Sequence, residues 1–459
     1  MRIAFAAALA AAATVVGVVA FPSDALANGR FPESNAIFFA SGDPQEIILR
    51  TTFGIIVSND RGKTWDWICD QSIGLAGVED PMLSVTPDGT VIASSFQGLA
   101  ISRDKSCNYE FAQGVLKDLV FIDLTSRPST PGNVIAFASS YDGQDDAGLI
   151  FFSSTLFETK DEGKTFVPLG MPFDPTLLGE TVDVTASDPD RIYVSAVRNP
   201  GTAATGVMLT SVNRGQTFTE TAIPLVPPER APFIAAVDPT NADRVYVRTS
   251  AGTDMPSRLL LSEDAGKTFR TVYTALGPLS GFALSPDGKK LFVGGPRDGV
   301  RVASTTDFQF VQKSTIEIQC LTVSTDGLWG CSNEKSGFVV GLSTDEGATF
   351  EPKLHFCDIR GPLACAPGST THTECSLGGT ASNASPPWPP QRAILGCGGG
   401  PVLDAGFDSG GIGESSPPGG DQMEGGGGCA LRAPSPTPVA ALVAGATAAV
   451  ALLRRRRRR

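Results

Sequence analysis

Five copies of one eight-residue pattern constrain the fold of this 459-residue chain more than any other feature. Each copy reads Ser/Thr-x-Asp/Asn-x-Gly-x-Thr and ends in Trp or Phe. The copies begin at Ser58, Thr159, Ser211, Ser262 and Ser343. Two weaker copies begin at Ser102 and Ser304, so successive starts lie 39 to 57 residues apart. A pattern that returns at such intervals is typical of stacked, equivalent supersecondary units. The sequence therefore predicts seven units.

Each unit is predicted to contain four short strands. Upstream of the motif lie a hydrophobic segment, a turn rich in Asp, Pro and Gly, and a β-branched run, as in residues 86–95 and 188–197. Strand-forming residues bounded by turn residues indicate strands, and four strands in a repeat of this length suit a propeller blade. Sustained 3.6-residue periodicity is nearly absent here, which argues against a helical solenoid. We expect an all-β, seven-bladed propeller over residues 28–356.

The third position of the motif predicts a structural turn. Its side chain can accept hydrogen bonds from nearby backbone N–H groups, while the glycine supplies a conformation with positive φ. The third positions are Asp60, Asp104, Asp161, Asn213, Asp264 and Asp345. The motifs resemble the Asp boxes, or BNR repeats, of sialidases, sortilin-type receptors and other secreted propellers. Over about residues 35–356, the resemblance implies that they lie between third and fourth strands, away from the ligand face. It also implies a structural role rather than a catalytic or calcium-binding one.

The N-terminus predicts export. Arg2 precedes an apolar run over residues 4–21, and an A-x-A site follows at residues 25–27. A basic residue, an apolar core and a small-residue cleavage site are typical of a secretory signal peptide. We assign residues 1–27 to such a signal.

The C-terminus predicts surface attachment. An apolar run over residues 439–453 is followed by six arginines. About 15 apolar residues are short for a bilayer crossing, yet the arginines would hold the end of the chain in the cytoplasm. We therefore predict a transmembrane helix and arginine tail over residues 439–459.

Cys429 stands just before this anchor, between a run of glycines and a Pro-rich stretch. The arrangement resembles the myxobacterial-type C-terminal sorting tag, MYXO-CTERM, and the resemblance implies that Cys429 is the site of processing and surface attachment. The alternative, an ordinary C-terminal membrane anchor, leads to nearly the same location. Residues 398–438 are rich in Gly, Ser and Pro, a composition that cannot bury a core and predicts a flexible stalk.

The remaining eight of the nine cysteines predict disulfides in an exported chain. Cys320 and Cys331 flank a turn of the last blade, where antiparallel strands would bring them together. Cys69 and Cys107 are the other two in the propeller, and their pairing is left open. The last four are expected to staple a small module over residues 357–397. They are Cys357, Cys365, Cys375 and Cys397.

Composition argues against several other classes of site. The formal net charge of −12 and the absence of a basic stripe exclude nucleic acid as an expected partner. The cysteines lack paired C-x-x-C steps and only His355 and His372 could join them, so no zinc site or other metal site is predicted. No phosphate-binding or dinucleotide-binding motif is present, so no cofactor is expected.

Candidate ligand-binding residues lie in the loops that follow the second strands. Four arginines recur there and could form a ring for a carboxylate or sulfate. They are Arg50, Arg198, Arg248 and Arg297. The alternative is that they pair with neighbouring Asp and Glu residues at strand ends. Further candidates are Tyr141, Asp145 and Asp146 in the long loop of blade 3, and Asp254 in blade 5.

Catalytic signatures are sparse. A sialidase-type site needs a tyrosine beside a carboxylate in a late blade, but blades 6 and 7 contain no tyrosine, and Tyr193 and Tyr246 are predicted to be core. Two histidines near the end of the ring give little scope for a Ser-His-Asp triad. We expect a non-enzymatic, surface-anchored module that binds a protein or a glycan, with no catalytic residue. Alternatives are a sialidase-like glycoside hydrolase and an assembly factor with one protein partner.

Overall fold

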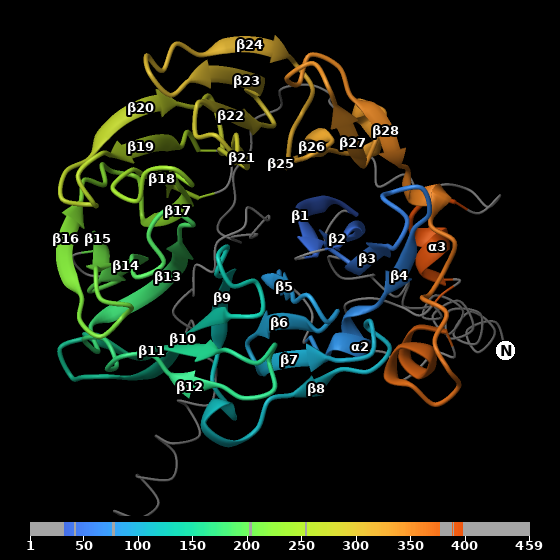
Figure 1. The fold of residues 1–459 in the computed structure, drawn as a ribbon, viewed down its shortest axis with the longest axis horizontal. Helices are drawn as coiled ribbons and strands as arrows, with labels where there is room; N and C mark the ends of the chain where they lie inside the picture. The colour runs from blue at the N-terminus through green and yellow to red at the C-terminus, as the bar shows by residue number, and fades with distance from the viewer. Residues whose placement is uncertain are drawn as a thin grey trace, which may run out of the picture.

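Seven four-stranded antiparallel sheets form a ring (Figure 1), which confirms the predicted propeller. We call the region enclosed by the seven innermost strands the channel. The computed structural model describes residues 32–40, 43–75, 79–201, 204–252, 255–376, 388 and 390–397. The predicted signal peptide, stalk and C-terminal helix lie outside these residues, as do Cys429 and Asp254. Among the residues that the structure describes, no helix has the length and apolar character needed to cross a bilayer.

Every blade is built from four consecutive strands, with the first strand innermost (Figure 1). Blade 1 contains β1 (Ser34–Ala40), β2 (Asp43–Thr51), β3 (Gly54–Ser58) and β4 (Asp66–Ile68). Blade 2 contains β5 (Leu83–Val85), β6 (Val91–Ser95), β7 (Gly98–Ser102) and β8 (Glu110–Phe111). Blade 3 contains β9 (Phe121–Ser126), β10 (Val134–Gln144), β11 (Ile150–Thr159) and β12 (Val167–Pro168). Blade 4 contains β13 (Leu177–Val184), β14 (Ile192–Arg198), β15 (Thr205–Ser211) and β16 (Thr219–Ile223).

The last three blades follow the same order. Blade 5 contains β17 (Ala231–Val237), β18 (Val245–Ser250), β19 (Arg258–Ser262) and β20 (Arg270–Thr274). Blade 6 contains β21 (Gly281–Leu284), β22 (Lys290–Gly295), β23 (Gly299–Ser304) and β24 (Val311–Ser314). Blade 7 contains β25 (Cys320–Ser324), β26 (Gly327–Cys331), β27 (Val340–Ser343) and β28 (Glu351–Leu354). The short helices are α2 (Asp70–Ile73), η1 (Gly114–Leu116), η2 (Glu334–Ser336), η3 (Phe356–Asp358), η4 (His372–Ser376) and α3 (Pro390–Ile394).

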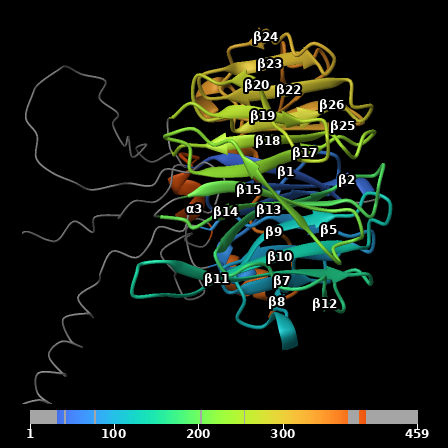
Figure 2. The same cartoon turned by 90° about the vertical axis from the view of Figure 1, so that its left-hand side faces the viewer.

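The up-and-down strand order gives the ring two different faces. Turns between first and second strands, and between third and fourth strands, lie at one end of each blade. Turns between second and third strands, and the connections to the next blade, lie at the other end. All seven copies of the motif fall between third and fourth strands, so we call the first side the motif face and the second the entry face. Figure 2 shows the ring edge-on, with the hairpin between β10 and β11 projecting from the disc.

The motif turns are held by their own side chains. In blade 5, Asp264 Oδ1 accepts hydrogen bonds from the Lys267 and Thr268 N–H groups (3.1 and 2.9 Å), and its Oδ2 accepts from Thr268 Oγ1 (2.7 Å). Ser262 Oγ accepts from the Gly266 N–H (2.9 Å). The Thr268 hydroxyl, and after it the Thr268 N–H, lower the pKa of Asp264 to about 2. The third position of this motif therefore serves as a turn cap.

The motif glycines also lock neighbouring blades together. Gly347 in blade 7 has φ of 86°, and a Cβ placed there would lie 2.5 Å from Val300 Cγ1 in blade 6. Gly266 in blade 5 faces Met208 of blade 4 in the same way, with a Cβ distance of 2.9 Å. Only glycine combines this backbone conformation with so close an approach. The repeat therefore fixes both the turn and the spacing between adjacent blades.

The first and last blades meet without sharing a strand. Ser34 Oγ of β1 donates to the Val339 carbonyl (2.8 Å), and Trp65 Nε1 donates to the Lys353 carbonyl (2.9 Å). Arg61 forms a two-bond ion pair with Asp326 (2.6 and 2.8 Å). Trp65, Trp67 and Trp329 belong to one buried cluster across this seam. These contacts close the ring without a covalent bond between the two blades.

A C-terminal extension then crosses the seam. It comprises residues 355–376, Trp388 and residues 390–397, and we call it the clasp. The chain runs along the outer edge of blade 1 (Figure 1), where the Trp67 N–H donates to the Gly361 carbonyl (2.7 Å) and the Leu363 N–H donates to the Trp67 carbonyl (2.8 Å). Pro362 thereby forms a parallel bridge with Trp67.

The disulfides correct part of the cysteine prediction. Cys320 pairs with Cys331, as predicted from the flanked turn. The expectation that the last four cysteines pair among themselves is right only for Cys357 with Cys397. The others join the clasp to the propeller, because the clasp follows the outer edges of blades 1 and 2. These bonds are Cys69–Cys375 and Cys107–Cys365.

Candidate functional site

The innermost strands present one unpaired edge to the channel, and acidic side chains occupy part of it. Asp123 of β9 accepts hydrogen bonds from the Leu124 N–H and, across the blade boundary, from the Val182 N–H (2.9 and 2.7 Å). Asp183 of β13 repeats this arrangement with the Val237 N–H of β17 (3.2 Å). Both carboxylates therefore join the inner strands of blades 3, 4 and 5.

Burial changes the acidity of these groups. It raises the pKa of Asp123 to about 7, against the hydrogen bonds from Val182 and Leu124, and the charge of Asp183 adds to the rise. Burial likewise raises the pKa of Asp183 to about 6. Glu180, which lies in a β-bulge of β13, has its pKa raised well above its usual value by burial. These three residues are not among the predicted site residues. An acid within an otherwise apolar strand segment is the sequence feature that could have identified them.

Arg50 reaches from β2 across its own blade to the next one. Its Nε donates to Asn35 Oδ1 (2.7 Å), and its Nη1 donates to the Asp80 and Pro81 carbonyls (both 3.2 Å). The side chain is 6% exposed. Since Asn35 belongs to the innermost strand and Pro81 leads into the innermost strand of blade 2, the guanidinium lies at the entry end of the channel.

Arg248 of blade 5 likewise reaches from the second strand of its own blade to the blade that follows. Its Nη1 donates to the Leu279 carbonyl, which precedes the innermost strand of blade 6 (3.1 Å). Its guanidinium carbon lies 5.3 Å from the centre of the Phe233 ring in β17. Burial, and after it the charge of Arg50, lower the pKa of Arg248 to about 10. Blades 1 and 5 lie on opposite sides of the ring (Figure 1), and the charge of Arg50 also opposes the rise in the pKa of Asp123.

The other two predicted arginines are placed differently. Arg198, at the end of β14, makes two hydrogen bonds to Glu220 (2.9 and 2.6 Å) and an ion pair with Asp174 (3.4 Å). It therefore follows the alternative prediction, pairing with acids at strand ends. Arg297 lies in the turn between β22 and β23, where its side chain packs beside Gly277. Arg50 and Arg248 thus both lie at the entry end of the innermost strands, whereas Arg198 and Arg297 are placed differently, so the four arginines do not occupy equivalent positions.

The candidates in blade 3 lie on the projecting hairpin. Tyr141 is 59% exposed and packs edge-on against Phe152. Asp145 caps the tip by accepting hydrogen bonds from the Ala147 and Leu149 N–H groups (3.0 and 2.8 Å), and Asp146 is exposed. Asp145 is therefore part of the turn, whereas Tyr141 and Asp146 are presented to solvent.

Exposed apolar side chains gather on the entry face. Seven large ones lie on its turns, its connections or the projecting hairpin, whereas Val212 is the corresponding residue on the motif-face turns of the described chain. The seven are Phe96, Val115, Tyr141, Met171, Val226, Met255 and Leu276. The two tyrosines that the sequence assigns to the core, Tyr193 and Tyr246, are both fully buried.

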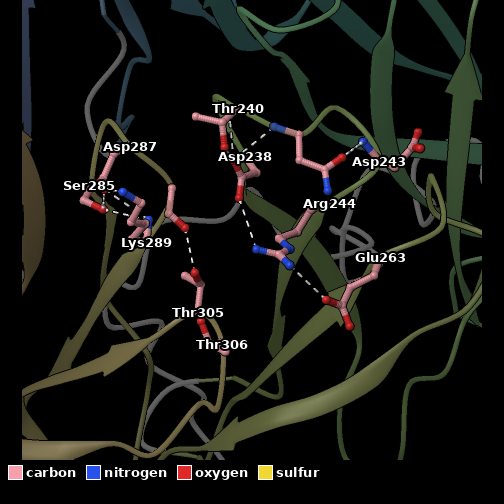
Figure 3. Close-up of polar contacts among 12 residues, drawn as sticks. Asp238, Thr240, Asp243, Arg244, Glu263, Ser285, Asp287, Lys289, Thr305 and Thr306 are labelled. Carbon is pink, nitrogen blue, oxygen red and sulfur yellow. Dashed lines mark hydrogen bonds and ion pairs between the residues drawn. The ribbon is translucent and has the colours of Figure 1, made fainter.

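A cleft lies toward the motif-face end of three innermost strands. It has a volume of about 270 Å³, lies between the inner strands of blades 5, 6 and 7, and is lined by residues such as Val237, Phe282 and Leu321. Beside it, Asp238 accepts hydrogen bonds from Thr240 and lies 3.6 Å from Arg244, which also pairs with Glu263 (Figure 3). These three charged residues lie in motif-face turns of blade 5 and do not line the cleft.

The tyrosines beside these turns differ in their contacts. Tyr193 Oη in blade 4 donates to the Ala242 carbonyl in the next blade (2.6 Å). The equivalent Tyr246 Oη makes no such hydrogen bond to blade 6, where the corresponding turn is shorter. Asp238 Oδ2 is without a hydrogen-bond partner in the described chain. In the described ranges, no three His, Cys, Asp or Glu side chains are grouped to hold a metal ion.

Comparison with known proteins finds only distant structural similarity. No protein-family model matches this chain, and no curated protein matches it. Similar solved structures include an ancestral GH74 enzyme, at 12% identity and a TM-score of 0.49, over 72% of this chain and 47% of that one. This chain thus spans about half the length of that enzyme. Another is the Saccharomyces cerevisiae protein Sqt1, at 11% identity and a TM-score of 0.45, over 70% of this chain and 85% of that one.

A third is the β-propeller domain of Cps50 (Swd1) from Myceliophteria thermophila, at 9% identity and a TM-score of 0.43, over 66% of this chain and 95% of that one. These neighbours include an enzyme and propellers not described as enzymes, so they do not bear on activity. The assignment rests on the strand order itself. The chain is a seven-bladed β-propeller of four-stranded blades.

Proposed function

We propose that this chain is an exported, surface-anchored Asp-box propeller that binds an acidic ligand without catalysis. The signal peptide predicted over residues 1–27 supports export, and the stalk and MYXO-CTERM-type tag around Cys429 support attachment. The ligand is a protein or a glycan bound at the entry face. The motif face serves as the rigid base.

The pair formed by Arg50 and Arg248 carries this proposal. Arg50 donates to Asn35 and to the Pro81 carbonyl, and Arg248 donates to the Leu279 carbonyl, so both guanidinium groups are held at the entry end of the innermost strands. A guanidinium presents its N–H donors in a fixed planar fork that matches a carboxylate or a sulfate. We therefore place the acidic group of the ligand between these two side chains.

The surroundings favour a protein over a glycan. Val226, Met255 and Leu276 are exposed on neighbouring connections of blades 4 to 6. Aliphatic and methionine side chains suit contact with apolar protein surface, whereas sugar binding relies more on polar and aromatic groups. An acidic segment flanked by apolar residues fits both the arginines and this rim.

The experiment compares binding by the wild type, Arg248→Met and the control Arg198→Met. The probes are sulfate, citrate, acidic peptides flanked by leucines, and glycans that carry carboxylates, measured by calorimetry. We expect at least one acidic probe to lose tenfold or more in affinity with Arg248→Met and to be unchanged with Arg198→Met. Equal affinity for all three proteins would contradict the assignment. Tighter binding of the glycans than of the peptides would show that the ligand is a glycan rather than a protein.

Two further measurements bear on the rest of the proposal. Release of nitrophenol from a panel of aryl glycosides would support the sialidase-like alternative. For attachment, cells that express the wild type or Cys429→Ala are treated with an external protease. We expect the wild-type protein to be digested on the cell surface, and the variant to be lost from that surface.

A further inference from the structure

The clasp makes the ring a covalently closed object. A ring of consecutive blades has an open seam where the last unit meets the first, and here the blade-to-blade contacts at that seam are noncovalent. The Cys69–Cys375 disulfide joins blade 1 to the clasp and has a sequence separation of 306 residues. Inside it, Cys107–Cys365 joins blade 2 to the clasp with a separation of 258 residues. Blades 2 to 7 therefore lie within one covalent loop.

Backbone and side-chain contacts hold the clasp in register along its course. Arg360 donates two hydrogen bonds to the Asp66 carboxylate at the start of β4. Further along, Thr371 donates from its N–H to the Cys107 carbonyl (3.1 Å) and from its hydroxyl to the Ser106 carbonyl (2.7 Å). Trp388 packs on Trp67, with ring centres 5.6 Å apart. The clasp is thus attached to blades 1 and 2 at several points besides its disulfides.

The disulfide connectivity determines which part of the protein bears a force that is applied to the C-terminus. The end of the clasp, Cys397, is bonded to Cys357 near its start, which lies directly after blade 7. From either point the covalent path reaches Cys69 of blade 1 through Cys375, without passing through the blades between them. Tension between the two ends of the chain therefore bypasses blades 2 to 7.

We infer that the clasp lets this propeller carry tension between a bound ligand and its tether without losing a blade. Without the clasp, a pull on the C-terminus would act first on β28, the outer strand of blade 7, and peel the blades in turn. With it, the pull is transmitted to the edge of blade 1 and the ring stays closed. The inference rests on the proposed attachment for its biological use, but its mechanics depend on the disulfides alone.

The test is single-molecule stretching of the full chain between click-reactive residues introduced at positions 30 and 400. The oxidised protein should extend only through blade 1 and parts of the clasp. Reduction should release the segment between Cys69 and Cys375, whose 306-residue separation corresponds to roughly 1,000 Å of contour length at about 3.4 Å per residue. Full extension of the oxidised protein would overturn the inference.

Paired cysteine-to-serine substitutions test how much of the released length depends on each disulfide. Removing Cys69 and Cys375 leaves the inner loop closed, so the oxidised variant should gain less than a fifth of the length that reduction releases. Removing Cys107 and Cys365 as well should release the segment between positions 69 and 375 without reductant, except for the short loops that Cys320–Cys331 and Cys357–Cys397 still close. The control removes Cys320 and Cys331, whose separation is only 11 residues, and should extend like the wild type. A large gain from that control would contradict the proposed path.

A second measurement does not require the variants to fold. A protease site is inserted between Asp146 and Ala147, at the exposed tip of the blade 3 hairpin, and the chain is cut there. On a denaturing gel without reductant the two fragments should migrate together, and with reductant they should separate. Separation without reductant would refute the closed loop. Failure of surface attachment in cells would leave both of these results unchanged, so the two proposals can fail separately.

Discussion

The two faces of the ring join their strands with different kinds of turn. On the motif face, one eight-residue turn recurs, and its acids and glycines are committed to capping and to the fit between blades. On the entry face, the turns and connections differ in length and sequence, from the two-residue turn at Phe96 to the projecting hairpin at Tyr141. Repetition marks the side where structure is fixed, and variation marks the side where we propose that a ligand binds.

The largest expected effect comes from filling a motif glycine. Gly347→Ala places a Cβ against Val300 and a side chain at positive φ. We expect a loss of about 3 kcal/mol in the free energy of unfolding, measured by urea denaturation. The matched control is Gly143→Ala on the entry face, where φ is also positive but no atom lies within 4 Å. It should cost about 1 kcal/mol. Equal losses would remove the distinction between the faces.

The channel acids should give the propeller an unusual dependence on pH. Because the pKa of Asp123 is raised to about 7, the folded state binds its proton at a higher pH than the unfolded chain does. This group therefore adds stability as the pH falls from 8 to 5, by about 2–3 kcal/mol. Asp183 acts in the same direction over a lower range. Asp123→Asn should flatten the change, as followed by denaturation at each pH. A wild-type stability that falls over this interval would contradict the assignment.

A smaller loss is expected when a motif cap is removed. Asp264→Ala takes away the acceptor for four hydrogen bonds and should cost about 1–2 kcal/mol. Because the folded pKa of Asp264 is lowered to about 2, its contribution is present above the pKa of the unfolded chain and is lost as the pH falls through about 2. Asp145→Ala, which uncaps the hairpin tip, should change global stability by about 0.5 kcal/mol or less. Thermal melts of the two variants provide the comparison.

The smallest effect on stability, and a selective effect on binding, is expected from the exposed apolar residues. Leu276→Ser should leave the melting temperature nearly unchanged but weaken any protein ligand of the entry face severalfold. Val212→Ser, on the motif face, should change neither quantity. If both variants weaken the ligand equally, the binding surface is not confined to the entry face.

The number and order of the blades could be predicted from the sequence because the repeated motif itself has a structural role. The motif that counts the blades also caps their turns, so its spacing carries the architecture directly. The disulfide between Cys320 and Cys331 was also predictable, since one short turn separates the two cysteines. The clasp was not, because Cys365 and Cys375 are far in sequence from the blades that they reach, and composition does not reveal where a chain returns.

The candidate site was predicted only in part, for a similar reason. Arg50 and Arg248 stand at matching strand positions, each three residues after the residue that pairs with the first motif position, and both lie at the entry end of the innermost strands. Arg198 stands three residues further along its strand and meets Glu220 and Asp174. Which partner an arginine finds depends on its register in the strand and on the loop that passes beside it. The repeat does not encode those loops. Asp123 and Asp183 were missed because their role depends on N–H groups that a neighbouring blade leaves unpaired.

The absence of a shared strand between blades 1 and 7 has a consequence for how such a chain can change over generations. Each blade is one uninterrupted stretch of sequence, so a duplication or deletion of that stretch alters the blade number without splitting any sheet. Blades 4 and 5, which repeat an Arg-x-Tyr-Val step in their second strands, illustrate such modularity. After such a rearrangement, the ring can still be closed covalently if the first two blades keep the cysteines that bond to the C-terminal clasp.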